Sequence, residues 1–221
     1  MSVLIYRDDK TVGACAATIL AAKILTAASC TIGVDYHETL LPVFESLSAM
    51  TENGLLAWND TKVYQLFEFL PDGSGEQRIA NLLGKALFAK TDISEKQYIV
   101  PFSTEQPPEE TARSFEEAIL NDGGLDAALI AVRHDGSLLM NQNAGCDPAA
   151  HAETIDGDSF LTAGLNALMQ CKCPIVVATG KNAAGAVKAM LKGSMLETPL
   201  AALRLHPGAT FILDEQAAEL L

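Results

Sequence analysis

Short apolar runs rich in β-branched residues alternate with helical patterns along the whole 221-residue chain, and this alternation is the strongest constraint on its fold. The runs that predict strands lie at 3–6, 30–34, 62–70, 97–102, 125–132, 174–179 and 210–213. Strands joined through helices pair in parallel, because each helix carries the chain back to the starting edge of the sheet. The sequence therefore predicts a mostly parallel sheet covered by helices on both faces.

Helical patterns fill the intervals between these runs. They lie at 11–25, 39–50, 76–90, 107–122, 160–169, 180–191 and 215–221. The first is apolar on nearly all sides, which predicts a buried helix, whereas 143–158 is polar and predicts a loop. No internal repeat or linker interrupts the pattern, so residues 1–221 are expected to form one domain.

Charge and cysteine content restrict the partners and the compartment. Acidic residues outnumber basic ones by 28 − 15 = 13, and a field of that sign repels nucleic acids and anionic membranes. No segment reaches the roughly 20 predominantly apolar residues of a membrane span, and no signal peptide is recognisable. Five cysteines, an odd number, indicate reduced thiols in a cytoplasmic protein. His37, His134 and His151 lack metal-site spacing, so neither a metal nor a cofactor is expected.

The order of elements, with three local strings, resembles the glucosamine-6-phosphate isomerase/deaminase family, whose relatives include galactosamine-6-phosphate isomerases and 6-phosphogluconolactonases. The strings lie at 124–130, 176–181 and 203–215. The resemblance covers nearly the whole chain. It implies a three-layer α/β/α sandwich with a mostly parallel sheet, like the glucosamine-6-phosphate isomerase, ribose-5-phosphate isomerase and CoA-transferase fold. It also implies a small polar, sugar-derived ligand, and it leaves a homo-oligomer open.

The family's catalytic segment has the pattern Gly-x-Gly-x-(Asp/Asn)-Gly-His, two residues, then Phe-Asn-Glu, and it corresponds here to 131–142. Asp135, Gly136 and Asn141 match this pattern. Both leading glycines are replaced, by Ala131 and Arg133. An Asp-Gly pair is also typical of a tight hairpin turn, so the segment predicts either a working site or a turn between 129–132 and 138–140.

Two of the family's proton-transfer positions carry other residues. Ser137 stands where the family has its catalytic histidine, and Gln142 stands where it has its relay glutamate. A hydroxyl or an amide does not shuttle protons near neutral pH as imidazole and carboxylate do. His134 lies three positions before Ser137. The candidate catalytic residues are Asp135, His134, Ser137 and Gln142.

The family's phosphate loop, Gly-(Gly/Ser)-(Ser/Thr)-(Thr/Pro), corresponds to 33–39, where Thr39 alone survives in kind. Such a loop holds phosphate through bare backbone N–H groups at a helix start. Asp35 and Glu38 place carboxylates there, which would repel a phosphate and predict an acidic N-cap. A polar site that includes His37 is the alternative.

Three further residues, with Asn141 from the catalytic segment, complete the candidate ligand-binding set. The family's general-base aspartate follows the middle strand, where Glu68 and Asp72 are the nearest carboxylates. Lys181 begins a helix and is either a phosphate contact or a solvated lysine. His206 lies in the matching C-terminal string and either belongs to a site or shapes a turn. The ligand-binding candidates are Asp35, His37, Thr39, Glu68, Asn141, Lys181 and His206.

Two classes of function remain open from the sequence. One is an enzyme of carbohydrate metabolism, an aldose–ketose isomerase/deaminase or a 6-phosphogluconolactonase-like hydrolase with altered chemistry. The other is a non-catalytic relative that senses a ligand or associates with a protein. The replacements at Ser137, Gln142 and Asp35 favour lost or altered catalysis of the family reaction.

Overall fold

The computed structural model describes residues 1–70, 78–101, 105–141, 147–155, 157–194 and 198–221. Within these ranges, seven strands form a sheet in which all neighbouring strands are parallel. In spatial order they are β1 (Ser2–Tyr6), β10 (Thr210–Asp214), β9 (Pro174–Ala178), β6 (Ala127–Ala131), β2 (Cys30–Val34), β3 (Thr61–Gln65) and β5 (Tyr98–Ile99). The predicted mostly parallel sheet is confirmed.

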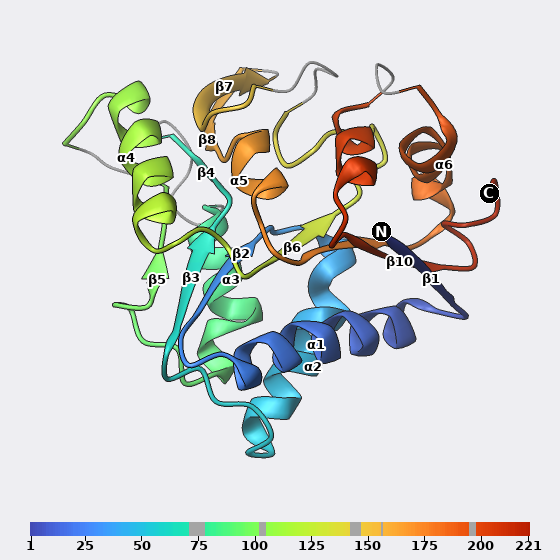
Figure 1. Ribbon diagram of the computed structural model, residues 1–221, viewed down its shortest axis with the longest axis horizontal. Coiled ribbons are helices and arrows are strands. Elements are labelled where there is room, and N and C mark those ends of the chain that lie inside the picture. The colour runs from blue at the N-terminus through green and yellow to red at the C-terminus, as the bar shows by residue number, and fades with distance from the viewer. Residues whose placement is uncertain (71–77, 102–104, 142–146, 156, 195–197) are drawn as a thin grey trace.

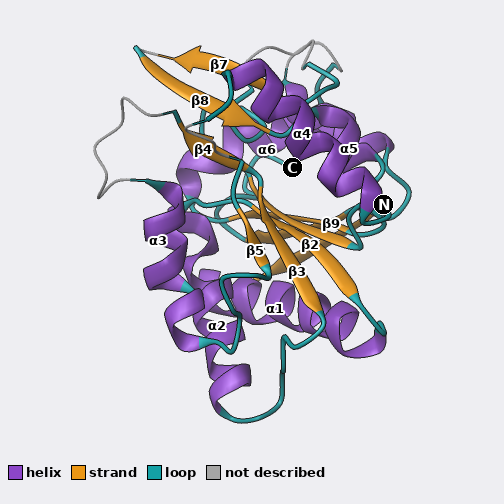
Figure 2. Cartoon of the chain, turned by 90° about the vertical axis from the view of Figure 1, so that its left-hand side faces the viewer, coloured by secondary structure: helices purple, strands orange, loops and turns teal. Residues whose placement is uncertain are grey.

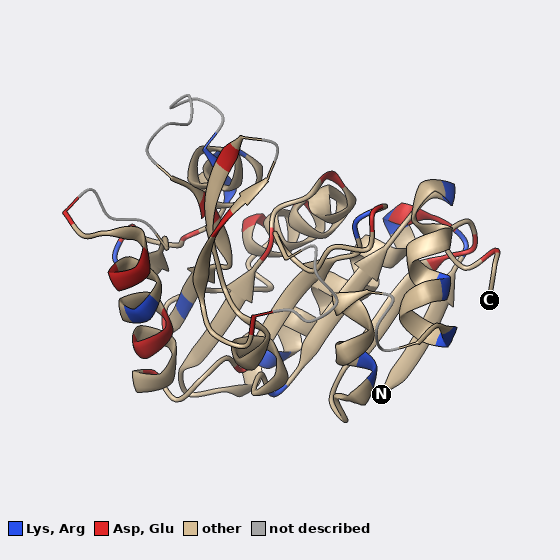
Figure 3. Ribbon diagram, turned by 90° about the horizontal axis from the view of Figure 1, so that it is seen from above, with Lys and Arg blue, Asp and Glu red and all other residues tan. Residues whose placement is uncertain are grey.

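Helices cover both faces of this sheet (Figures 1 and 2). One face carries α1 (Asp9–Thr26) and α2 (Leu41–Glu52), and the other carries α4 (Pro108–Asn121), α5 (Leu165–Met169) and α6 (Ala184–Lys192). Strand β6 shows why two layers are needed, because its side chains alternate between the two apolar clusters of the core. The central strands β2, β6 and β9 carry no charged residue (Figure 3). The three-layer α/β/α sandwich is confirmed.

A small antiparallel sheet lies beside α4 (Figure 2). Its strands, in spatial order, are β4 (Phe67–Phe69), β8 (Asp158–Thr162) and β7 (His151–Ile155). The remaining elements are α3 (Ile79–Ala86) and the 3-10 helices η1 (Glu38–Leu40), η2 (Phe88–Lys90), η3 (Lys181–Ala183) and η4 (Pro199–Leu205). Among the described residues, no helix is long and apolar enough to cross a membrane.

The small sheet corrects three sequence predictions. The strand expected at 62–70 is divided between the two sheets at Leu66, since β3 pairs with β2 whereas β4 pairs with β8. The helix expected at 160–169 is a strand up to Thr162 and a helix only from Leu165. The loop expected at 143–158 contains β7. Contact between the Phe69 and Phe160 rings, whose centroids are 4.5 Å apart, stabilises the pairing of β4 with β8 and so favours a strand at 160–162.

Two other local predictions are wrong. The segment 215–221 forms turns rather than a terminal helix, because seven residues are too few for a stable helix without a partner surface. The hairpin, one of the two alternatives for Asp135 and Gly136, does not form, since Leu138 pairs with Asn141 instead of a strand residue.

Helices α1 and α2 approach closely at Gly13. A Cβ atom on Gly13 would lie 2.6 Å from Pro42 Cβ and 2.7 Å from the Pro42 carbonyl carbon. Backbone atoms cannot yield as a flexible side chain can, so Gly13 allows the helix crossing that places Pro42 at the carboxyl edge of the sheet.

Gly13→Ala should therefore destabilise the fold by about 1–3 kcal/mol, the usual cost of overpacking a tight contact. Gly185→Ala is the matched control, because Gly185 is exposed in α6 and a Cβ there meets nothing within 4 Å. The control should gain up to about 1 kcal/mol from helix propensity. Urea unfolding measures both, and equal effects would contradict the proposed close packing.

Candidate functional site

A cavity of about 590 Å³ opens at the carboxyl edge of the parallel sheet. Its walls come from the segments that follow β2, β6, β9 and β10, together with the start of α1. The polar side chains that line it are Asp9, His37, Glu38, Thr39, His134 and Lys181, among others. Ligands of open parallel α/β sheets bind outside the carboxyl ends of the strands, so this cavity is the candidate site.

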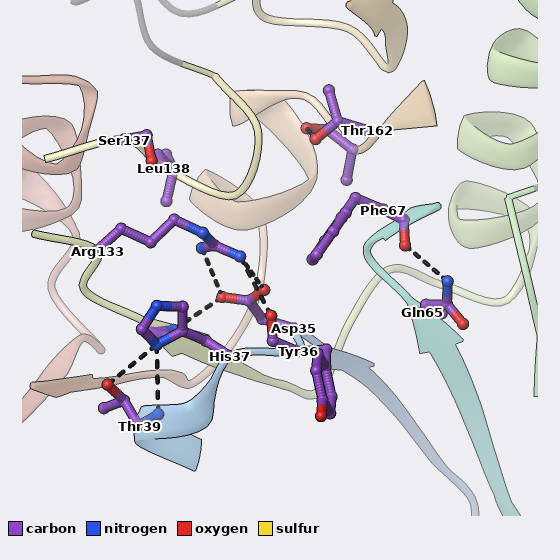
Figure 4. A network of polar contacts seen from close by, with 12 residues as sticks. Asp35, Tyr36, His37, Thr39, Gln65, Phe67, Arg133, Ser137, Leu138 and Thr162 are labelled. Atoms are coloured by element: carbon purple, nitrogen blue, oxygen red, sulfur yellow. Dashed lines mark hydrogen bonds and ion pairs between the residues drawn. The ribbon is translucent and has the colours of Figure 1, made fainter. Parts of the chain in front are cut away.

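A buried ion pair lies beside the cavity and joins two of its walls (Figure 4). Asp35 follows β2 and is fully buried, and Arg133 follows the neighbouring strand β6. Their guanidinium and carboxylate groups meet in a two-point contact of 2.8 Å and 3.0 Å. The Ala131 N–H donates to the same carboxylate at 2.9 Å. Asp35 is therefore satisfied within the protein, and its side chain does not line the cavity.

Arg133 also makes contacts beyond Asp35. One of its terminal nitrogens donates to the Tyr36 carbonyl at 3.3 Å. The guanidinium carbon lies 5.4 Å from the centroid of the Phe67 ring, a cation–π distance. Arg133 thus occupies a position that the resemblance assigns to a glycine, and it packs against the segments after β2 and β3.

His37, rather than an acid, caps the helix after β2. Its backbone is extended, with φ −159° and ψ 153°, and its Nδ1 accepts the Thr39 N–H at 3.3 Å. The Thr39 hydroxyl lies 3.0 Å from the same nitrogen. The predicted acidic N-cap is wrong, because Asp35 turns towards Arg133 and leaves the cap position to His37.

The surroundings of His37 lower the pKa of its imidazole. Burial is the main cause, and the positive charge of Arg133 adds to it, while Asp35 and Glu38 oppose the shift. A lowered pKa keeps the ring neutral at physiological pH. The Thr39 N–H requires the same state, since it can only donate.

Asp135, Gly136 and Ser137 form a tight turn beside the cavity. The Ser137 N–H and hydroxyl donate to one Asp135 carboxylate oxygen at 2.9 Å and 2.8 Å. Burial alone would raise the pKa of Asp135, but these two hydrogen bonds, together with the nearby His134 and Arg133, lower it overall. Gly136 has a φ of +78°, and its carbonyl accepts the Thr198 hydroxyl. Ser137 is buried, so its hydroxyl serves this turn.

Glu68 lies outside the cavity and caps another helix. Its carboxylate is fully buried and accepts the N–H groups of Ile79 and Ala80, both at 3.0 Å, at the start of α3. The Phe69 N–H and the Gln65 side-chain amide also donate to it, at 2.8 Å and 3.2 Å. Its surroundings make Glu68 an anchor between β4 and α3.

The other candidates are divided between the two edges of the sheet. Lys181 lines the cavity, is largely exposed and lies 3.7 Å from the Glu219 carboxylate. Asn141 is buried and donates to the Leu138 carbonyl at 3.2 Å. His206 is buried before the start of β10, at the opposite edge of the sheet, where its Nδ1 accepts the Gly208 N–H at 3.0 Å. Gln142 and Asp72 lie outside the described residues.

The structure brings His37, Thr39, His134 and Lys181 together around one cavity.

Asp214 is a structural contributor that the sequence analysis missed. Its carboxylate accepts the Gly180 N–H at 2.9 Å and 3.0 Å and the Ala217 N–H at 2.7 Å. The available signal was an aspartate at the end of an apolar strand run, whereas its contact with Gly180, 34 positions away, depends on the order of the strands. In the described part of the chain, no group of three or more His, Cys, Asp or Glu could hold a metal ion.

No protein-family model matches the chain. Curated relatives are similar along its whole length. The glucosamine-6-phosphate deaminase of Pseudoalteromonas translucida is 27% identical over 242 residues, covering 100% of this chain and 90% of the relative. The deaminase of Corynebacterium aurimucosum is 28% identical over 243 residues, covering 100% and 94%. The predicted resemblance to glucosamine-6-phosphate deaminases is confirmed.

Solved structures agree on the fold. A monomeric glucosamine-6-phosphate deaminase superposes with a TM-score of 0.91 at 20% identity and covers 100% of both chains. The 6-phosphogluconolactonase of Thermotoga maritima superposes with a TM-score of 0.79 at 17% identity, covering 96% of this chain and 98% of the other. The chain therefore has the fold of the deaminases and lactonases.

Removing one partner of the buried ion pair should be costly. Arg133→Met leaves the Asp35 carboxylate buried without its guanidinium, and we expect a loss of about 3–5 kcal/mol of stability. The double variant Asp35→Asn/Arg133→Met should recover much of that loss. Lys62→Met is the control, because it breaks the exposed ion pair with Asp122 and should cost at most about 1 kcal/mol. Equal losses from the two single variants in urea unfolding would refute the buried-pair account.

The cap at His37 should make stability depend on pH. The folded protein holds the ring neutral, whereas the unfolded chain protonates it near pH 6.5, at about the ordinary value. The folded state then binds fewer protons, so this contribution is complete above about pH 6.5 and is lost as pH falls through the lower pKa of the folded state. Unfolding of the wild type and of His37→Asn, whose amide caps without titrating, measures the difference. If the difference in unfolding free energy between the wild type and His37→Asn stays constant from pH 8 to 5, the proposed effect of the His37 cap is contradicted.

Proposed function

We propose that this protein binds a small polar, sugar-derived molecule in the cavity at the carboxyl edge and does not catalyse the deamination for which its relatives are named. Ser137 carries this proposal. It stands where the resemblance places the proton-shuttling histidine, it is buried, and its hydroxyl already donates to Asp135. No proton carrier is therefore available at that position near neutral pH.

The charges around the cavity favour a neutral ligand over a phosphate. Asp9 and Glu38 contribute two carboxylates to the walls, and Lys181 lies near the Glu219 carboxylate. The Thr39 N–H, at the helix start where the family pattern holds phosphate, donates to His37 instead. A doubly charged phosphate would meet carboxylates and fewer free donors, which costs electrostatic free energy.

A second candidate function is hydrolysis or isomerisation by a relocated group. His37 and His134 line the same cavity, and 6-phosphogluconolactonases share the fold. Either imidazole would have to act in place of the missing histidine.

We place the protein in the cytoplasm, where its buried thiols at Cys30, Cys171 and Cys173 stay reduced.

Purified protein should release ammonia from glucosamine 6-phosphate far more slowly than ordinary enzymes turn over, which is about 1–1000 per second. A deaminase relative assayed under the same conditions is the positive control. Ammonia release by this chain within the ordinary range would overturn the proposal of lost deamination.

Thermal denaturation tests the charge of the ligand. Neutral sugars and sugar lactones should raise the melting temperature more than the matching sugar phosphates do. Lys181→Ala is the control variant and should leave the effect of neutral ligands nearly unchanged. If only the sugar phosphates stabilise the protein, and Lys181→Ala abolishes this effect, the cavity prefers anionic ligands and the proposal is wrong.

A further inference from the structure

The hydrogen bonds of His37 determine which of its ring nitrogens carries the proton. A backbone N–H can only donate, so Nδ1, which accepts from Thr39, is unprotonated. The Thr39 hydroxyl lies 3.0 Å from the same nitrogen and can donate to it as well. In a neutral ring the proton must then reside on Nε2.

The groups around His37 keep the ring in this neutral state. Arg133 and His134, from the segment after β6, oppose a further positive charge, while Asp35 and Glu38 on the same segment as His37 favour it. Asp35 is already bonded to Arg133, which reduces its influence. Asp9 and Lys181, from the remaining walls, contribute one charge of each sign. Protonation of Nδ1 would also break the helix cap.

We propose that the Nε2–H of His37 is the group that recognises the ligand, and that it selects a neutral carbonyl oxygen such as that of a sugar lactone or an open-chain sugar. This inference rests on the proposed binding of a sugar-derived molecule. His37 lines the cavity, and its ring lies at the cavity wall beside Arg133 (Figure 4). A neutral imidazole donates a hydrogen bond to a carbonyl and polarises it without adding a charge.

The ligand class follows from the donor. A carbonyl oxygen accepts hydrogen bonds and has no proton of its own, so it matches a fixed N–H donor. A phosphate would gain more from a cation than from a neutral ring, and an ammonium group has no acceptor for the Nε2–H. The exposed His134 lines the same cavity.

The first test concerns the free protein. Nitrogen-15 spectra of the histidine rings between pH 6.5 and 8 should show the His37 Nε2 protonated and Nδ1 unprotonated. Thr39→Val removes the hydroxyl and keeps the N–H, so it should preserve this tautomer. A protonated Nδ1 or a charged His37 ring in that range would overturn the inference.

The second test concerns binding. The probes are D-glucono-1,5-lactam, a stable six-membered ring with a carbonyl and a ring N–H, and 1,5-anhydro-D-glucitol, which has the same hydroxylated carbon skeleton with a ring oxygen and no carbonyl. Calorimetry on the wild type should show that the lactam binds about tenfold more tightly than the anhydroglucitol. This factor corresponds to one net hydrogen bond of about 1.4 kcal/mol. His37→Asn keeps the cap but lacks the reach of Nε2, so it should reduce the lactam affinity to that of the anhydroglucitol.

The outcomes separate this inference from the proposed function. If the lactam binds His37→Asn as tightly as the wild type, the role of His37 is refuted while the binding function stands. If the wild type prefers the anhydroglucitol, the carbonyl selection is refuted. If neither probe nor any neutral sugar binds the wild type, both the proposed function and the inference fail.

Discussion

The salt bridge between Asp35 and Arg133 determines how the carboxyl edge of the sheet is arranged. It connects residues that are 98 positions apart in the chain but follow neighbouring parallel strands. Burying two charges is expensive, and the cost is offset here because the carboxylate also accepts the Ala131 N–H and the guanidinium also contacts Tyr36 and Phe67. The segments after β2 and β6 are thereby held together, with the cavity beside them.

The replacements in the two family motifs depend on one another physically. The buried charge of Arg133, at a position that the resemblance assigns to a glycine, requires a counter-ion, and Asp35 after β2 provides it. Once Asp35 turns to Arg133, the helix start needs another cap, and His37 supplies it. The segment 35–39 thus forms an internal network with Arg133, and this network supports the proposal that the protein keeps the fold without the deamination chemistry.

The sequence predicted the layers better than the site. The runs at 30–34, 125–132, 174–179 and 210–213 correspond to β2, β6, β9 and β10, because strands buried on both faces are apolar throughout. The run at 62–70 predicted one strand where the structure has two, because Leu66 continues the apolar pattern while the chain passes from one sheet to the other. Periodicity reports burial and does not report which sheet a strand joins.

Individual side chains were harder to place from the sequence. The sequence puts Asp35 and Arg133 after two strands, but only the order of the strands reveals that they meet. Glu68 follows a strand as a binding residue would, yet the N–H groups it accepts come from α3, eleven and twelve positions later. His37 was a candidate ligand contact, whereas its role as a helix cap depends on a backbone conformation that the sequence does not show.

The most direct test of the account is a crystal structure grown with glucosamine 6-phosphate. The account predicts that Arg133 remains bonded to Asp35, that His37 still accepts the Thr39 N–H, and that no phosphate is held by the backbone N–H groups of residues 36–39. A phosphate bound by those N–H groups, with Arg133 released from Asp35, would contradict it.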